Sequence, residues 1–168
     1  MELERVGRTV LLALLAFFAF TFAVLPCDAQ FSGGAVSPAS AFSIPQSQLI
    51  QPDALNRTLQ TGGTNRPLVL QVGSHVMYSQ AHIPGSFFAG PGSQSDGLKL
   101  LESIVAKVPK SRFIVLYCGC CPWNRCPNVG PAYKRLHEMG FTNVKVLYLA
   151  NNFGDDWLYK GYRVEQGE

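Results

Sequence analysis

Blocks of basic residues are missing from this chain of 168 residues. Its 14 Lys and Arg residues and 11 Asp and Glu residues are dispersed along the sequence, so the charge pattern does not indicate a nucleic-acid-binding protein. Internal repeats are also absent, which argues against a solenoid or a propeller. The length is sufficient for one domain with its own hydrophobic core.

One long apolar run is present, over residues 9–25. It follows a short charged segment, and Pro26-Cys-Asp-Ala29 places small residues at the −3 and −1 positions of an export cleavage site. We therefore predict that residues 1–29 are a signal peptide and that the protein is periplasmic or extracellular. An uncleaved membrane anchor and acylation of Cys27 are the alternatives, and no other membrane contact is expected. Cleavage would raise the net charge from +3 to +4, a mild bias that suits a small anionic substrate.

Residues 30–47 are rich in Ser, Gly, Ala and Pro and are predicted to form a flexible linker before a domain at residues 48–168. Apolar runs predict strands at 67–72, 87–88, 113–117 and 144–148. Helices are expected from Pro52 to about residue 61, from Asp96 to about residue 108, at 131–139 and at 153–159, with Asp53 and Asp96 as N-caps. The segment 75–80 is expected to be short and polar. This alternation predicts an α/β fold with a mainly parallel central sheet flanked by helices.

The four cysteines of the predicted domain all lie within nine residues, directly after the apolar strand at 113–117: Cys118, Cys120, Cys121 and Cys126. Disulfides that stabilise exported proteins join distant segments, and closing so short a loop contributes little. The loop instead lies between the carboxyl end of a strand and the start of a helix, where ligands bind in α/β proteins. A thiol in this position is expected to be acidified and reactive.

Three interpretations of the additional cysteines remain open. The first is that they are resolving thiols, so that Cys120, Cys121 or Cys126 shares a persulfide or a disulfide with Cys118. The second is that all four thiols bind a Zn²⁺ or Cu⁺ ion. The third is a structural disulfide such as Cys121–Cys126. The C-x-C-C-x4-C spacing differs from the paired C-x2-C motif of zinc knuckles.

Several segments in a fixed order resemble the rhodanese (sulfurtransferase) family, over roughly residues 48–166. The matching segments are Ala81-His-Ile-Pro-Gly-Ser86, Tyr117-Cys118, Met139-Gly-Phe141, Asn143-Val-Lys-Val146, and Trp157 with Gly161. The resemblance implies a rhodanese-like fold. Two departures stand out: Gln71-Val-Gly73 replaces the Asp-Val-Arg of the family, and the 22 positions from Cys118 to Gly140 are about five more than the family pattern gives.

The resemblance also implies a sulfurtransferase that takes a sulfane sulfur from an anionic donor of the thiosulfate type and passes it to a thiol or cyanide. Cys118 is then the catalytic residue that carries a persulfide, with Cys120 and Cys121 as alternate nucleophiles and Cys126 as an auxiliary thiol. Gly119 allows close backbone approach, Trp123 walls the pocket, and Arg125 binds the donor. No cofactor is expected.

Two other functions remain as alternatives: a periplasmic thiol–disulfide redox protein and a non-catalytic module that binds a metal or sulfur. A phosphatase, suggested by the spacing of Cys120 and Arg125, is disfavoured because the sequence positions no catalytic acid. His82 is expected to be a packed, hydrogen-bonded side chain and not a catalytic base. The sequence does not indicate an oligomeric state.

Overall fold

The computed structural model describes residues 44–167. The apolar segment 9–25, the cleavage site and most of the linker lie outside these residues, so the export prediction is not tested. No helix within residues 44–167 is long and apolar enough to cross a membrane.

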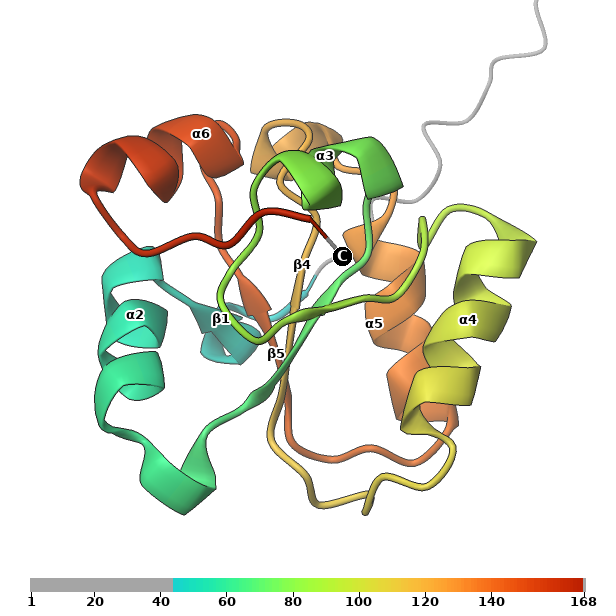
Figure 1. The fold of residues 1–168 in the computed structure, drawn as a ribbon. Helices are drawn as coiled ribbons and strands as arrows, with labels where there is room; N and C mark the ends of the chain where they lie inside the picture. Colours follow the sequence, from blue (N-terminus) through green and yellow to red (C-terminus); the bar gives the residue numbers. More distant parts are fainter. Residues whose placement is uncertain (1–43, 168) are drawn as a thin grey trace, which may run out of the picture. The chain divides into compact units, whose positions relative to one another are not determined.

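Five parallel strands form the central sheet, in the order β1-β5-β4-β2-β3 (Figure 1). Their bounds are Leu49–Ile50 (β1), Leu68–Gln71 (β2), Phe87–Phe88 (β3), Ile114–Tyr117 (β4) and Val144–Leu147 (β5). All four neighbouring pairs are parallel, which confirms the predicted fold class. The short strand β1 was not predicted, because two partly buried residues carry no periodic pattern.

Five α-helices in the described part of the chain connect and cover the strands. They are α2 (Pro52–Thr61), α3 (His75–Gln80), α4 (Ser95–Val105), α5 (Val129–Glu138) and α6 (Phe153–Asp156). Of the short 3-10 turns, η3 (Trp123–Arg125) lies in the cysteine loop and η4 (Leu158–Lys160) precedes the C-terminal segment. The predicted N-caps are wrong. Gln51 and Gln94 hold those positions, and Asp53 and Asp96 lie in the first turns, where a carboxylate also favours the helix dipole.

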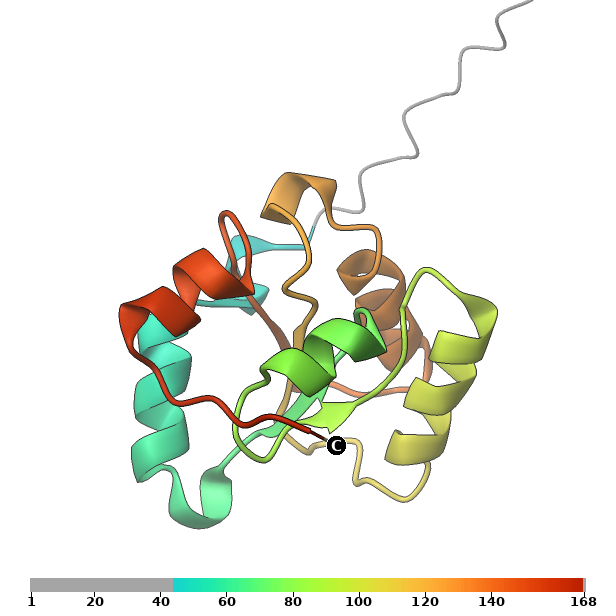
Figure 2. The same ribbon diagram turned by 45° about the horizontal axis from the view of Figure 1, so that its top comes forward.

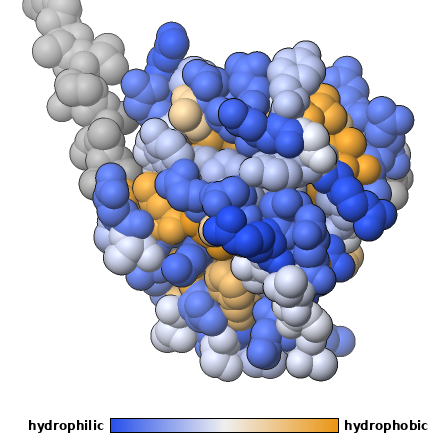
Figure 3. All heavy atoms as spheres, turned by 90° about the vertical axis from the view of Figure 1, so that its left-hand side faces the viewer, coloured by the Kyte–Doolittle hydropathy of each residue, from blue (hydrophilic) through white to orange (hydrophobic). Residues whose placement is uncertain are grey.

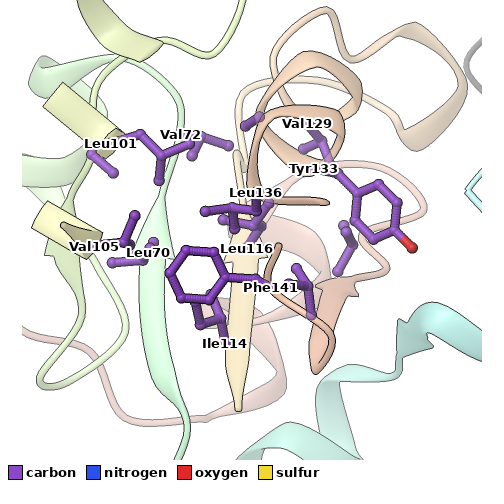
Figure 4. Close-up of a cluster of buried hydrophobic side chains, with 14 of the residues drawn as sticks. Leu70, Val72, Leu101, Val105, Ile114, Leu116, Val129, Tyr133, Leu136 and Phe141 are labelled. Atoms are coloured by element: carbon purple, nitrogen blue, oxygen red, sulfur yellow. The ribbon is translucent and has the colours of Figure 1, made fainter. Parts of the chain in front are cut away.

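The sheet has a hydrophobic cluster on each face. On one face, side chains of β2, β4 and β5 pack against α4 and α5, and Leu70, Leu116, Leu136 and Phe141 lie at the centre of this cluster (Figure 4). On the other face, Val69, Val115 and Tyr117 pack with Leu55 of α2 and Phe153 of α6. Both faces of β4 are therefore covered, as expected for a continuous apolar strand in a parallel sheet.

The segment after η4 returns to pair with the segment Ala81-His-Ile-Pro-Gly-Ser86. His82 and Glu165 exchange two backbone hydrogen bonds of 2.9 Å in an isolated antiparallel bridge. His82 is 4% exposed, its ring stacks on Tyr78 with centroids 4.0 Å apart, and its Nδ1 lies 2.9 Å from the Tyr78 carbonyl oxygen. The structure thus confirms His82 as a packed, hydrogen-bonded side chain.

The loop after β4 lies at the same end of the sheet as α3 and α6 in both ribbon views (Figures 1 and 2). The carboxyl ends of β2, β4 and β5 all lead into this end, because the strands are parallel. The face that carries α2 and α6 is mainly hydrophilic where it is coloured, with separate small hydrophobic areas (Figure 3). The candidate site is therefore the strand-end region and not an exposed apolar face.

Candidate active site in the cysteine loop

Cys118 is the first residue after β4, and only 3% of its surface is exposed. Strand alternation points its side chain toward the α4/α5 side, where it belongs to the same cluster as Leu116 and Val129. Gly73 closes over it, since a Cβ atom on Gly73 would lie 3.0 Å from the Cys118 Sγ. The side chain predicted to be the nucleophile is thus at the strand end, as expected, but it is buried.

Gly119 makes the turn out of the strand. Its φ of +85° lies in the left-handed region, and a Cβ atom here would lie 2.8 Å from the Cβ of Phe153. Its carbonyl oxygen accepts a 3.0 Å hydrogen bond from the Phe153 amide. The backbone at Gly119 thus approaches the start of α6 closely, while the substrate-binding role of Gly119 stays a prediction.

The loop brings the four thiols together. The Cys118 and Cys120 Sγ atoms are 3.1 Å apart, and the Cys120 and Cys121 Sγ atoms are 3.2 Å apart. Cys126 packs against the hydrophobic cluster that contains Cys118, and each of the two thiols shifts the pKa of the other. All four are free thiols, so the structural disulfide Cys121–Cys126 is not formed. The Cys121 thiol instead donates to the Arg125 carbonyl oxygen at 3.7 Å.

These separations do not suit a metal site. Thiolates around a tetrahedral zinc ion, each about 2.3 Å from the metal, are about 3.8 Å from one another. The Cys118–Cys120 and Cys120–Cys121 sulfur–sulfur distances are well below this value. Within residues 44–167, no group of three or more His, Cys, Asp or Glu side chains is arranged to hold a metal ion. This geometry does not favour the metal-binding alternative, which stays a prediction.

The acidity of the thiols differs from the sequence-based prediction. Hydrogen bonding to Cys126 and burial raise the pKa of the Cys118 thiol, so the expected acidification of Cys118 is wrong. The hydrogen bond from Cys118 and those from the backbone amides of Asn128 and Val129 lower the pKa of Cys126 to about 6, against the effect of its own burial. Burial, with hydrogen bonding to Cys120, raises the pKa of Cys121 to about 12. Cys118 and Cys126 therefore titrate as an interacting pair, in which the pKa of Cys126 is the one that is lowered.

Two buried amide side chains, those of Asn128 and Gln71, donate hydrogen bonds to Cys118, and the sequence analysis missed the role of both. Asn128 Nδ2 donates to the Cys118 Sγ at 3.3 Å, while its Oδ1 accepts hydrogen bonds from the Ser93 backbone amide at 3.1 Å and hydroxyl at 2.7 Å. Asn128 occupies the N-cap position of α5, yet its side chain makes no capping hydrogen bond. An Asn before a helix is usually read as a cap, and only the fold shows that this one binds a thiol instead.

Gln71 is the second amide. It is 2% exposed, and its Nε2 donates to the carbonyl oxygens of Cys118 at 3.2 Å and Ser74 at 3.4 Å. Its Oε1 accepts from the Gly73 amide at 3.1 Å. The signal for this role was the departure at Gln71-Val-Gly73, where a neutral amide now links the ends of β2 and β4.

A cleft of about 290 Å³ opens beside Cys118 on the side of α3, α6 and the C-terminal segment. Its lining includes Gln71, Met77, Tyr117, Cys118, Phe153 and Leu158, and none of its lining residues within the described chain is charged. The predicted substrate-binding residues Trp123 and Arg125 do not line this cleft. Trp123 packs against Tyr148 with ring centroids 5.5 Å apart, and Arg125 is exposed in η3.

Comparison with known proteins decides the family. The family model of the rhodanese-like domain matches residues 51–149. The chain belongs to the rhodanese-like family. This family is associated with sulfur transfer, and the rhodanese-like match includes β2, β4, β5 and the complete cysteine loop. A comparison with curated proteins finds no match.

Solved structures share the rhodanese-like fold at low sequence identity. BH2092 from Bacillus halodurans is 22% identical with a TM-score of 0.56, and the alignment covers 71% of this chain and 77% of that one. Alr3790 from Anabaena sp. is 22% identical with a TM-score of 0.54, covering 70% and 92% of the two chains. EanB, solved as a cysteine persulfide with ergothioneine, is 20% identical with a TM-score of 0.53, covering 70% of this chain and 27% of EanB. At these identities the likeness supports the fold alone.

Proposed function

We propose that the protein is an exported sulfurtransferase that takes a sulfane sulfur from a small anionic donor such as thiosulfate and holds it as a persulfide in the cysteine loop. The single observation that carries the proposal is the buried Cys118 at the end of β4, in contact with a second thiol and with an amide N–H donor. A thiol or cyanide then accepts the sulfur. Export rests on the composition of residues 1–29.

The surroundings of Cys118 suit a stored persulfide. A persulfide is an anion at neutral pH and is easily lost to solvent thiols, so it needs hydrogen-bond donors and shelter from water. The Asn128 side-chain amide supplies a donor, and the 3% exposure of Cys118 supplies the shelter. The uncharged cleft beside it is a route by which an acceptor thiol reaches the stored sulfur.

Both half-reactions balance without a cofactor. In the first, a cysteine thiolate attacks the outer sulfur of thiosulfate, the donor S–S bond breaks, and sulfite leaves with the bonding electrons. In the second, an acceptor thiolate attacks the outer sulfur of the persulfide and the cysteine thiolate is released. Arg125, exposed in the loop, attracts the anionic donor.

The test is the intact mass of the reduced protein before and after thiosulfate, with a variant in which all four loop cysteines are serine as the control. The wild type is expected to gain about 32 Da, the mass of one sulfur atom, and to release thiocyanate when cyanide is added. The control gains nothing. A wild type that gains no sulfur from thiosulfate, or from a polysulfide, contradicts the proposal.

A second candidate is a thiol–disulfide redox protein, favoured by the 3.1 and 3.2 Å sulfur–sulfur contacts along Cys118, Cys120 and Cys121. The same mass experiment separates the two functions. A redox protein would lose about 2 Da, two hydrogen atoms, on mild oxidation and would reduce a model disulfide without gaining sulfur.

A further inference from the structure

The buried Cys118 sulfur lies against an exposed thiol. Gly119 alone separates Cys118 from Cys120 in the chain, and the two Sγ atoms are 3.1 Å apart. Cys118 is 3% exposed, whereas Cys120 is exposed. The backbone between them is held in place, because the Gly119 carbonyl oxygen accepts a 3.0 Å hydrogen bond from the Phe153 amide. A persulfide on Cys118 is therefore sheltered from solvent while it stays in contact with an internal thiol.

The distance between these two sulfurs favours one of the two reactions that a neighbouring thiol can have with a persulfide. Attack of Cys120 on the outer sulfur would move that sulfur to Cys120. With the outer sulfur in line between them, the two Sγ atoms would be at least about 4.1 Å apart, twice the length of an S–S bond. Attack on the inner sulfur, which is the Cys118 Sγ itself, needs a separation of about 3–3.5 Å between the reacting atoms. The observed 3.1 Å fits the second reaction.

We propose that Cys120 is the resolving thiol of this site: it attacks the Cys118 persulfide at the inner sulfur, releases hydrogen sulfide and leaves a Cys118–Cys120 disulfide. An external dithiol then reduces this disulfide. The protein thus carries its own acceptor, and the full cycle converts thiosulfate and a dithiol into sulfite, hydrogen sulfide and an oxidised dithiol. The inference rests on the proposed function, because it starts from the persulfide that thiosulfate leaves on Cys118.

The release of hydrogen sulfide balances within the protein. Loading leaves a persulfide anion on Cys118 and a thiol on Cys120. The Cys120 proton passes to the outer sulfur, and the Cys120 thiolate then attacks the Cys118 Sγ. The bond between the Cys118 Sγ and the outer sulfur breaks, and HS⁻ leaves with the bonding electrons. The two cysteine sulfurs are oxidised to a disulfide, and the sulfane sulfur is reduced to sulfide.

The surroundings of the two sulfurs also suit the reduction step. Forming the disulfide requires the Sγ atoms to move about 1 Å closer, from 3.1 Å to about 2.05 Å. Thiol–disulfide exchange depends on access, so an external dithiol attacks the exposed Cys120 sulfur. Cys118 then leaves as a thiolate, beside the Asn128 Nδ2, which donates to its Sγ at 3.3 Å. The second thiol of the dithiol releases Cys120 and completes the cycle.

The first experiment follows the intact mass of the reduced protein after thiosulfate is added, without oxygen and without an external acceptor. Sulfite and sulfide are measured in the same samples for wild type, Cys120→Ser and the exposed-loop control Asn124→Ser. Wild type is expected to gain about 32 Da and then to lose about 34 Da as hydrogen sulfide, which leaves it about 2 Da below the reduced protein. Cys120→Ser is expected to stop at the first gain and to release sulfide roughly tenfold or more slowly. Asn124→Ser is expected to behave as wild type.

Sulfite and sulfide separate the failure of this inference from the failure of the proposed function. If wild type releases no sulfite and gains no sulfur, the proposed function fails and the inference fails with it. If wild type releases sulfite but keeps the added sulfur, on Cys118 or on Cys120, the sulfurtransferase stands and the resolving step is overturned. Equal sulfide release from wild type and Cys120→Ser also overturns it. Tandem mass spectrometry locates the disulfide, and a bond that involves Cys121 or Cys126 in place of Cys120 contradicts the assignment.

The second experiment makes cyanide compete with Cys120 for the sulfur, a readout that a purely structural role would not move. As cyanide is increased, wild type is expected to divide the sulfur between sulfide and thiocyanate, whereas Cys120→Ser forms thiocyanate alone. The rate constant of sulfide release by wild type is expected to stay the same over a roughly tenfold range of protein concentration, because the attacking thiol belongs to the same chain. A rate constant that rises with protein concentration would show that a second molecule supplies the thiol, and the proposal would be overturned.

Discussion

Replacing Gln71 by Glu tests whether a neutral amide is required between the ends of β2 and β4. The side chain is 2% exposed and faces two carbonyl oxygens, of Cys118 at 3.2 Å and of Ser74 at 3.4 Å. A protonated carboxyl can donate to one of these oxygens, but a carboxylate repels both and is desolvated. We therefore expect the pKa of the new carboxyl to be raised in the folded protein above its unfolded value of about 4.3.

A raised pKa gives the effect a definite sign. Below about pH 4 the carboxyl is protonated in both states, and the cost of Gln71→Glu is small. As the pH rises, the unfolded state releases its proton first, and the free energy of unfolding falls by about 1.4 kcal/mol per pH unit until the folded pKa is passed. A rise of two units in the pKa would therefore cost about 3 kcal/mol at neutral pH.

Urea denaturation under reducing conditions at several values between pH 4 and pH 7.5 measures this loss. Gln60→Glu is the matched control, since Gln60 is exposed on α2 and its substitution introduces the same group. The difference between wild type and Gln71→Glu is expected to grow with pH, while that of the control stays nearly constant. If the difference in the free energy of unfolding between wild type and Gln71→Glu does not change with pH, the new carboxylate is not repelled by the carbonyl oxygens of Cys118 and Ser74, and the argument is refuted.

Three further predictions concern the same region. Gly140→Ala is expected to lower the free energy of unfolding by roughly 1–2 kcal/mol in urea denaturation, because Gly140 has a positive φ. Gly119→Ala is expected to lower it by more, because Gly119 also has a positive φ and the new methyl group would in addition press against Phe153. Equal losses in the two variants would contradict the predicted clash with Phe153. Tyr117→Phe is expected to cost about 1–3 kcal/mol in the same assay, since it leaves a buried backbone amide without its acceptor, and a neutral effect would indicate that water replaces the hydroxyl. Arg125→Ala is expected to raise the thiosulfate concentration for half-maximal sulfur loading by roughly threefold or more at low salt. Its thermal stability is expected to stay nearly unchanged, because Arg125 is exposed. An unchanged thiosulfate concentration would show that Arg125 does not bind the donor.

The distribution of charge in the loop bears on which donors the site accepts. The only cation predicted to bind the donor, Arg125, lies on the exposed side of the loop near Cys126, while the cleft beside Cys118 has an uncharged lining.

The sequence alone was sufficient for the fold class and for the location of the site. Apolar runs of four to six residues predicted β2, β4 and β5 within two residues of their observed ends, because strands buried on both faces leave a continuous apolar signal. The position of Cys118 directly after β4 followed from the same pattern. The helix α3 was missed, since its six residues are too few to show a helical period.

Only the tertiary structure decided the chemistry of the individual thiols. The sequence places Cys118 and Cys120 two residues apart but does not show that their sulfur atoms lie 3.1 Å from each other, or that the Asn128 side chain donates to the Cys118 sulfur. It shows Gln71 and Asn128 as ordinary polar residues, although both are buried and hold Cys118. The acidity of a thiol depends on its burial and on the donors around it in space, which spacing along the chain does not fix. For this reason the sequence did not predict that the pKa of Cys118 is raised, whereas the pattern of apolar residues did predict the fold.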